Sequence, residues 1–129
     1  MITRSVTVAK IRREYWQMIA EGRKRFELRD EEVDWRSRLF VFVDAATGEH
    51  LGQARILSRT AFGGYEGSSW NWGLLSKLVE VPVDELKELF PDAVELGGHA
   101  YDAYAMYVYE IEPAGDDEVL DALLEGSDA

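Results

Sequence analysis

The sequence predicts one α+β domain, in which a curved or closed sheet carries short helices at its ends. The chain of 129 residues is long enough for one hydrophobic core but short for two domains and a linker. Strand and helix periodicities follow one another without an internal repeat or a low-complexity block. Apolar residues make up 47% of the composition, as in globular proteins.

The first elements are expected to be a strand, a helix and a second strand. Residues 5–9 alternate β-branched and small side chains, which is typical of a strand. Residues 11–21 place apolar side chains at helical spacing, and Gly22 stands where a helix favours a left-handed residue after its end. Phe26 and Leu28 then share one face of an extended segment, because side chains alternate along a strand.

A hairpin and a long loop are expected in the middle of the chain. Residues 38–43 are almost continuously apolar, which indicates a strand buried on both sides or the inner wall of a small barrel. Turn residues at 44–49 lead into a strand over residues 51–59, so the two strands should form a hairpin. Residues 62–73 interleave four aromatic residues with four glycines and are predicted to form a loop.

Two helices, a central strand and a tail complete the expected order. Leucines between residues 74 and 78 indicate a short helix, and a second apolar stripe begins after Pro82 and ends at Pro91. Residues 103–112 read as a strand buried on both faces, which the turn at 113–115 should end. We therefore place the domain at residues 1–113 and an acidic tail at 114–129. Residues 116–125 of that tail could form a short amphipathic helix that docks on the domain.

The charge distribution restricts the class of ligand. The formal net charge is -11, which argues against loose binding to duplex DNA or to an anionic membrane. Residues 1–60 nevertheless carry a net charge of +3, whereas residues 61–129 carry -14. A local basic site on an acidic chain can hold a small anionic or polar ligand while discouraging indiscriminate binding of polyanions.

Composition also excludes several kinds of chemistry. No cysteine is present, so the chain has no disulfide, thiolate nucleophile or zinc ribbon. His50 and His99 lack the spacing of metal ligands, and we expect neither a metal nor another cofactor. Ser68 and Ser69 lie outside any nucleophile-elbow pattern. The amino terminus has no apolar signal segment and no stretch could span a membrane, so we expect a cytoplasmic protein.

The leading candidate site comprises Lys24, Glu27 and Arg29. On a regular strand Glu27 and Arg29 project from one face about 7 Å apart, and Arg29 would keep the carboxylate ionised. Lys24 has the opposite parity and joins them only if the chain bends after Gly22. Such a trio suits a nucleobase edge, a phosphate or a polarised carbonyl. The alternative is a solvated strand face with ion pairs.

Aromatic residues of the predicted loop are the second candidate. Tyr65, Trp70 and Trp72 could stack on a base, each contact being worth roughly 1 to 3 kcal/mol. The alternative is that these rings fill the hydrophobic core, because aromatic side chains are heavily used for burial.

The segment Gly22-Arg-Lys24-Arg-Phe-Glu27-Leu-Arg29, preceded by a helix, resembles the G-x-K-x-x-E-x-R signature of the ASCH (activating signal cointegrator homology) domain family. The expected strands fit the family's order, and the likeness covers about residues 5–112. The resemblance implies a β-barrel of the pseudouridine-synthase-and-archaeosine-transglycosylase (PUA) type, with Lys24, Glu27 and Arg29 in a cleft beside it. It also implies binding of RNA or another nucleic acid.

Two functions in this cleft stay open, and a third lies outside it. The first is a module that binds single-stranded RNA, a nucleotide or a modified nucleoside. The second is a hydrolase, because some bacterial proteins of similar sequence are ribonucleases or amidohydrolases of an acetylated cytidine. Lys24 would polarise the scissile group and Glu27 would act as general base. The amidohydrolases carry a threonine nucleophile where this chain has Glu27. The third is protein interaction through the acidic tail.

Overall fold

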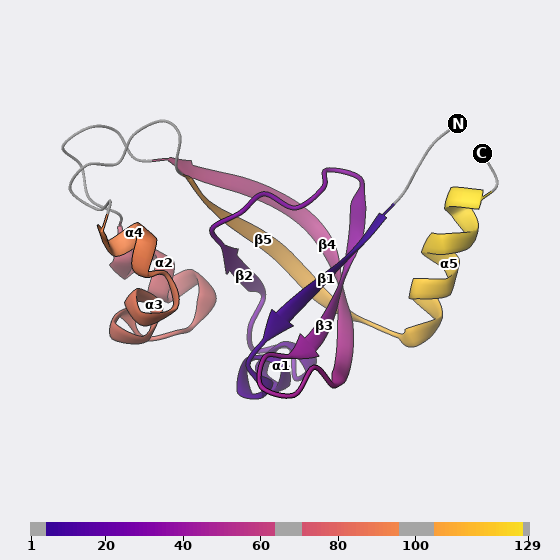
Figure 1. Cartoon of the computed structure of the whole chain (residues 1–129), viewed down its shortest axis with the longest axis horizontal. Helices are drawn as coiled ribbons and strands as arrows, with labels where there is room; N and C mark the ends of the chain where they lie inside the picture. The colour runs from indigo at the N-terminus through magenta and orange to yellow at the C-terminus, as the bar shows by residue number, and fades with distance from the viewer. Residues whose placement is uncertain (1–4, 64–70, 96–104, 128–129) are drawn as a thin grey trace. The chain divides into compact units, whose positions relative to one another are not determined.

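The computed structural model describes residues 5–63, 71–95 and 105–127 (Figure 1). In these ranges five strands form one mixed sheet in the order β1-β3-β4-β5-β2. Their bounds are Ser5–Ile11 for β1, Phe26–Arg29 for β2, Ser37–Asp44 for β3, His50–Gly63 for β4 and Ala105–Ala114 for β5. The predicted α+β class is confirmed. The sheet has two edge strands, β1 and β2, and is not closed, so the PUA-like barrel is not confirmed.

The pairing of the first strands follows from their connections. β1 runs parallel to β3, with Val8 opposite Val41, because helix α1 and β2 intervene between them. β3 and β4 are antiparallel, with Phe40 opposite Ala54, and a short turn joins them. The predicted hairpin is therefore confirmed. Gly48 takes the positive φ of 76° that this turn requires.

Within the described residues, five helices accompany the sheet. Their bounds are Arg13–Ala20 for α1, Trp72–Val79 for α2, Val83–Leu89 for α3, Pro91–Glu95 for α4 and Asp116–Ser127 for α5. Ile11 was expected in the first helix but ends β1 as a buried residue opposite Asp44. Pro91 was expected to end the preceding helix, but it is the first residue of α4. Proline suits this position, because the N–H that it lacks would have no partner within the helix there.

The predicted aromatic loop is too long at both ends. β4 continues to Gly63, and α2 already begins at Trp72. Asn71 caps α2, since its side chain accepts a hydrogen bond from the backbone N–H of Leu74 at 3.0 Å. β5 likewise continues two residues beyond its expected end and includes Pro113.

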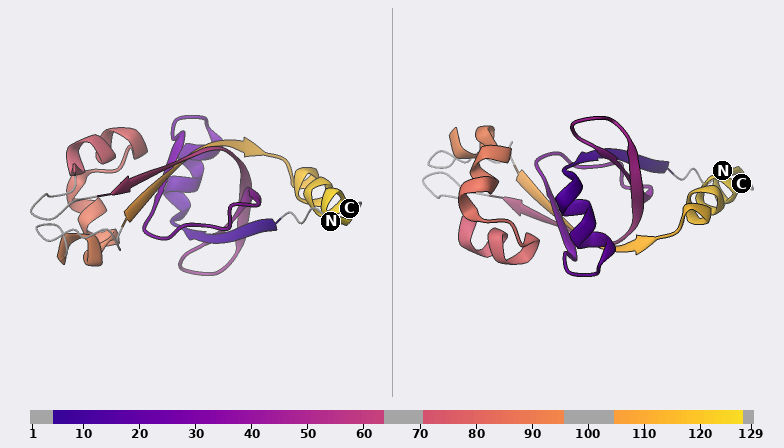
Figure 2. Two further views of the ribbon diagram at one scale, coloured as in Figure 1. Left: turned by 90° about the horizontal axis from the view of Figure 1, so that it is seen from above. Right: turned by 90° about the horizontal axis from the view of Figure 1, so that it is seen from below.

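The chain divides into two compact units. Residues 1–25, 33–58 and 110–129 belong to the first unit, and residues 26–32 and 59–109 belong to the second. β4 and β5 each contribute residues to both. Figure 2 shows the same elements from two further directions. None of the helices in the described ranges is long and apolar enough to cross a membrane.

The first unit packs α1 against β3 and β4. Trp16 of α1 lies 5.9 Å from Phe42, measured between ring centroids, and its ring also covers the backbone of Gly52. A Cβ atom at position 52 would lie 2.1 Å from this ring, so only glycine fits there. The buried apolar residues of this unit are Ala9, Ile11, Tyr15, Ile19, Leu39, Phe40, Phe42, Ala54, Ile111 and Ala122.

The second unit contains β2 and the three helices α2 to α4. α2 contacts both β2 and α3, and α3 contacts α4. Burial of leucine, valine and aromatic side chains supplies the stabilising apolar area. The buried apolar residues of this unit are Leu28, Leu75, Val79, Val81, Leu86, Ala93, Met106, Val108 and Tyr109.

Candidate functional site

Gly22 turns the chain from α1 toward β2. Its φ of 78° is the left-handed conformation that the sequence predicts after this helix. The N–H of Gly22 donates to the carbonyl of Ile19 at 3.0 Å, and the N–H of Arg23 donates to the carbonyl of Met18 at 2.9 Å. These two bonds are the Schellman arrangement, which satisfies the last carbonyls of a helix. The N–H of Lys24 also donates to Met18, at 3.1 Å, so the turn fixes the backbone of the first candidate residue.

Lys24 is buried in the first unit. Only 3% of this residue is exposed, although lysine is almost never fully buried without compensation. A charged ammonium group loses its hydration on burial and needs polar partners in return. The solvated alternative is therefore wrong for Lys24.

Glu27 and Arg29 form an ion pair on β2, in the second unit. Arg29 Nη1 donates to Glu27 Oε2 at 3.1 Å. The alternation predicted for this strand is thus confirmed, since residues two apart lie on one face. Glu27 is 6% exposed, and the Arg29 side chain is 21% exposed. Salt screens the attraction between these two charges less than it screens a surface ion pair. The pair also needs good hydrogen-bond geometry, because both groups lose hydration on burial.

The other arginines of the same stretch behave as ordinary surface groups. Arg23 pairs with Glu21 at 2.7 Å, and Arg25 pairs with Glu110 at 3.3 Å. Their side chains are 58% and 68% exposed. The run of charges that begins after Gly22 is therefore divided into buried and solvated members.

The aromatic candidates are only partly described. Tyr65 and Trp70 lie outside the described residues. Trp72 is the first residue of α2, and its half-buried ring lies 6.0 Å from the Nζ atom of Lys87 on α3. This distance is within the range of a cation–π contact, which stabilises the packing of α2 on α3.

Sequence reasoning did not single out Arg59. Its guanidinium lies over the ring of Tyr109, 5.9 Å from the centroid, within the second unit. Tyr109 is fully buried. Arg59 is the last residue of the predicted second hairpin strand. Its neighbours Ser58 and Thr60 are polar, so no apolar alternation was available from which to predict its orientation.

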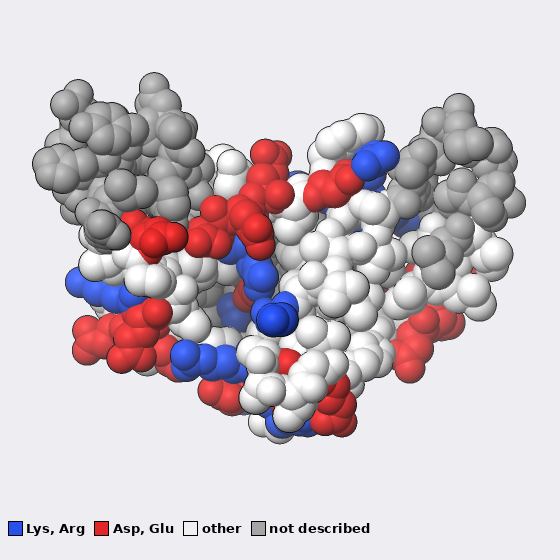
Figure 3. Space-filling model, viewed as in Figure 1, with Lys and Arg blue, Asp and Glu red and all other residues white. Residues whose placement is uncertain are grey.

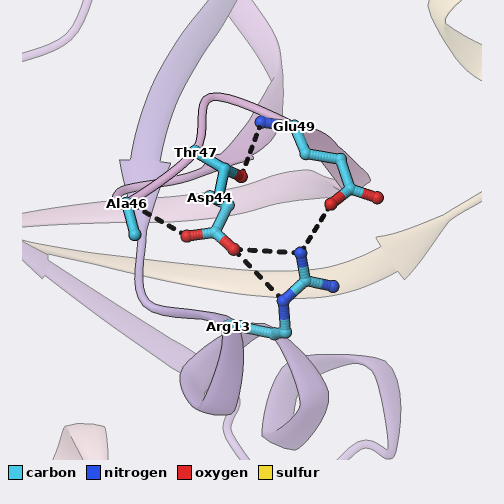
Figure 4. Close-up of polar contacts among 5 residues, drawn as sticks. All are labelled: Arg13, Asp44, Ala46, Thr47 and Glu49. Carbon is cyan, nitrogen blue, oxygen red and sulfur yellow. Dashed lines mark hydrogen bonds and ion pairs between the residues drawn. The ribbon is translucent and has the colours of Figure 1, made fainter.

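Two ion-pair clusters of the first unit join distant elements. Figure 4 shows Arg13 of α1 reaching the β3–β4 turn, where it donates to Asp44 at 3.1 Å and to Glu49 at 2.7 Å. Its hydrogen bonds to Glu49 and Asp44 raise the pKa of Arg13. The pKa of Asp44 is lowered first by the amide N–H of Ala46 and then by Arg13, while burial opposes the shift.

The second cluster attaches α5. Arg55 donates from Nε and Nη2 to the two carboxylate oxygens of Glu118, at 2.7 and 2.6 Å, and also contacts Glu112. The hydrogen bonds with Arg55 lower the pKa of Glu118, and Glu118 raises the pKa of Arg55. Both clusters connect elements of the fold and contain none of the predicted site residues.

Two hollows of the first unit border α5. One has a volume of about 280 Å³ and is lined by Arg38, Leu39, Arg55, Glu118, Asp121 and Ala122. The other measures about 420 Å³ and is lined by Val41, His50, Gln53, Asp116 and Val119. In the second hollow His50 hydrogen-bonds Gln53 at 3.0 Å, so this histidine has a structural partner.

The chemistry available at the candidate residues is recognition by donors and acceptors. A carboxylate accepts hydrogen bonds from amino groups, and a guanidinium presents several donors in a fixed plane. Lysine adds a compact positive charge. Such groups can read a nucleobase edge or hold a phosphate.

No family model matches the sequence, and no curated protein matches it. Solved structures do match the fold. The hypothetical protein PH0355 shares 16% identity, with a TM-score of 0.53, over 85% of this chain and 100% of the other. A serine-to-alanine mutant of ZmASCH from Zymomonas mobilis shares 10% identity, with a TM-score of 0.56, over 94% of this chain and 81% of the other.

A third solved structure agrees with these two. Protein EF3133 from Enterococcus faecalis V583, described as a DUF984 protein, shares 12% identity with a TM-score of 0.52. The match covers 88% of this chain and 78% of that protein. Similarity at this level of identity concerns the backbone arrangement, which persists when sequences have diverged. The chain has an ASCH-like fold.

Proposed function

We propose that the protein is a nucleic-acid-binding module that recognises single-stranded RNA, a nucleotide or a modified nucleoside through Lys24, Glu27 and Arg29. We assign the module to residues 1–113, with residues 114–129 as an appended acidic segment. The observation that carries the proposal is the burial of Glu27, 6% exposed and 3.1 Å from Arg29, in a strand of only four residues.

The burial of ionisable groups supports a binding role over a purely structural one. A buried ion pair contributes little net stability, because the lost hydration offsets the attraction between the charges. Lys24, three residues before Glu27, is buried as well. Two buried charged residues so close in sequence are better explained by recognition of a ligand than by stability.

Each side chain has a role in the proposed complex. Glu27 accepts a hydrogen bond from the amino group of a base, whereas Arg29 and Lys24 donate to phosphate or base oxygens. Tyr65, Trp70 and Trp72 stack on bases. The net charge of -11 favours a short single strand or a nucleotide, because a long duplex would meet the acidic half of the chain.

Fluorescence anisotropy with a panel of labelled single-stranded RNA oligonucleotides tests this function. We expect Arg29→Ala to weaken binding about tenfold, in line with the loss of one good contact to a base or phosphate. Arg23→Ala is the matched control, because this arginine belongs to the same stretch but is 58% exposed and paired with Glu21. Circular dichroism of both variants separates loss of binding from loss of folding.

Salt dependence provides a second criterion. The logarithm of the binding constant should fall with the logarithm of salt concentration with a slope of about -0.7 for each phosphate contacted. A slope that reflects only a few contacts, reduced in Arg29→Ala, agrees with the proposal. Absence of binding across the RNA panel, or equal losses in the Arg23 and Arg29 variants, rejects it.

The alternative function, a hydrolase that uses the same residues, is tested by measuring breakdown of RNA or of an N-acylated nucleoside by the same protein. Lys24→Met and Glu27→Gln would then abolish breakdown of RNA or of an N-acylated nucleoside while leaving the circular dichroism spectrum unchanged. Lys24 would stabilise an oxyanion and Glu27 would activate water in that mechanism. Turnover that persists in both variants rules this mechanism out.

A further inference from the structure

Helix α5 is attached to the first unit by polar contacts at its start. The Nε2 atom of Gln53 donates to the Asp116 carboxylate at 2.6 Å and to the Ala114 carbonyl at 3.1 Å. Two residues later, Arg55 donates to both carboxylate oxygens of Glu118. Gln53 is 2% exposed, so a buried side chain holds the start of α5 through these two part-buried bonds.

The anchored side of α5 is narrow. Glu118 and Val119 are half-buried, and Ala122, one turn further, is 5% exposed. These residues follow the i, i+1, i+4 spacing of one helical face. The helix also lies beside β1 (Figure 2). The side that faces the domain therefore contains an alanine, a valine and a paired glutamate, and neither Leu120 nor Leu124.

The opposite side of α5 exposes both of these leucines. Asp117, Leu120, Asp121 and Leu124 fall at i, i+3, i+4 and i+7, and all four are exposed. Leu120 is 57% exposed and Leu124 is 52% exposed. The sequence indicates a helix whose apolar stripe could dock on the domain. In the structure Val119 of that stripe is half-buried, whereas Leu120 and Leu124 lie one turn apart on the outer face.

The charge of this outer face is uniformly negative. α5 contains five acidic residues and no lysine or arginine. In Figure 3 the start of α5 is marked by acidic side chains with no basic ones beside them on the face seen. Asp121 also lines the smaller hollow with Arg38 and Arg55, whereas Asp117 of the outer face does not line it.

We propose that the outer face of α5 is a docking surface for a basic amphipathic helix of another protein. The partner would place apolar side chains on Leu120 and Leu124, and lysine or arginine next to Asp117 and Asp121. Apolar residues at helical spacing flanked by charges of the opposite sign are the usual complement of such a face. Two copies of α5 would instead bring like charges together, and an anionic membrane would repel the helix.

A designed peptide tests this surface. The probe is a labelled 14-residue peptide of leucine and lysine with the leucines at helical spacing, and its control is a peptide of the same composition in scrambled order. Fluorescence anisotropy should show at least about tenfold tighter binding of the helical peptide to the full chain, a difference of about 1.4 kcal/mol. Asp117→Asn should weaken this binding, as should added salt.

The leucines are tested by the double variant Leu120→Ala and Leu124→Ala. Alanine maintains helix propensity, so α5 should persist, and circular dichroism checks this. The double variant should bind the helical peptide at least about tenfold more weakly. Leu57→Ala is the matched control, because Leu57 is 51% exposed on β4 and should leave binding within about twofold of the unsubstituted chain.

Three results would overturn the proposal. The helical and scrambled peptides could bind equally, which would show that only their net charge, and not the spacing of their leucines, is recognised. The Leu57 and double variants could lose affinity alike. Finally, sedimentation could show a dimer of the chain that the double variant abolishes, which would make a second copy the occupant of the face.

Discussion

The indole ring of Trp16 occupies the space that a side chain at position 52 would need. A Cβ atom on Gly52 would lie 2.1 Å from Cζ2 of that ring. Real Cβ atoms do not approach a ring so closely, so the Trp16 ring would have to shift from its packing on Phe42 to admit a methyl group. We expect Gly52→Ala to lower the free energy of unfolding by about 1–3 kcal/mol, as for other overpacked sites, measured by urea denaturation.

Gly73→Ala is the matched control for this prediction. The nearest atom to a Cβ at position 73 is the side-chain oxygen of Asn71 at 3.9 Å, which is an ordinary contact. Alanine in a helix should leave stability unchanged or raise it by up to about 1 kcal/mol. Replacing Trp16 by alanine should also make the Gly52→Ala change much less harmful. Equal losses at positions 52 and 73 would contradict this account of the packing.

Gly22 should be sensitive to substitution for a different reason. No atom lies within 4 Å of a Cβ built there, so space is not limiting, but φ is 78°. We expect Gly22→Ala to destabilise the protein by about 1 kcal/mol and Gly22→Asn to do so less, because asparagine tolerates the left-handed region. Thermal denaturation measures both. A neutral alanine variant would show that the turn between α1 and β2 has no conformational requirement.

The acid stability of the protein should depend on Asp44. Its pKa lies below the ordinary value of 3.8, first because of the Ala46 amide and then because of Arg13. The folded state therefore binds this proton more weakly than the unfolded chain does. The contribution to stability is complete above the unfolded pKa and is lost as the pH falls through the lower folded pKa.

Urea denaturation at a series of pH values tests this linkage. Asp44→Asn should be less stable than the unsubstituted protein at neutral pH, and the difference should shrink as the pH falls below about 4. Arg13→Gln should show part of the same pH dependence, because it removes the second cause of the shift. A difference that stays constant over the whole series would refute the role assigned to Asp44.

Attachment of α5 should depend on Arg55. Arg55→Gln removes the bidentate contact with Glu118, which is one of the stronger kinds of hydrogen-bonded ion pair. We expect amide hydrogen exchange in residues 116–127 to accelerate several-fold, because local opening of the helix becomes easier. Arg36→Gln is the control, since Arg36 pairs with Asp34 two residues away. Unchanged exchange in the Arg55 variant would show that the ion pair between Arg55 and Glu118 does not hold α5 in place.

Local features of the fold were predictable because neighbouring residues determine them. Helix spacing and the glycine at its end identified α1 and the left-handed Gly22, and turn residues identified the hairpin of β3 and β4. The order of strands was not predictable, because it depends on pairings between distant segments. The division of α5 into an anchored side and an exposed side likewise depends on Gln53 and Arg55, about sixty residues earlier.

The candidate site was predictable in residue type and spacing but not in burial. Strand alternation correctly placed Glu27 and Arg29 on one face, where Arg29 Nη1 lies 3.1 Å from Glu27 Oε2. It could not separate the buried Lys24 and Glu27 from the exposed Arg23 and Arg25, because burial is decided by segments that pack against the strand. The convergence of Lys24 with the pair and the stacking roles of Tyr65, Trp70 and Trp72 stay predictions.

The place of β5 in the sheet has a consequence for biosynthesis. β5 lies between β4 and β2, although nearly eighty residues separate β2 from it along the chain. As the ribosome releases the chain from its amino terminus, β2 lacks its neighbouring strand until β5 has been synthesised. Nascent chains that stop before residue 105 should therefore hold Glu27 and Arg29 in an unpaired segment, open to proteases and chaperones.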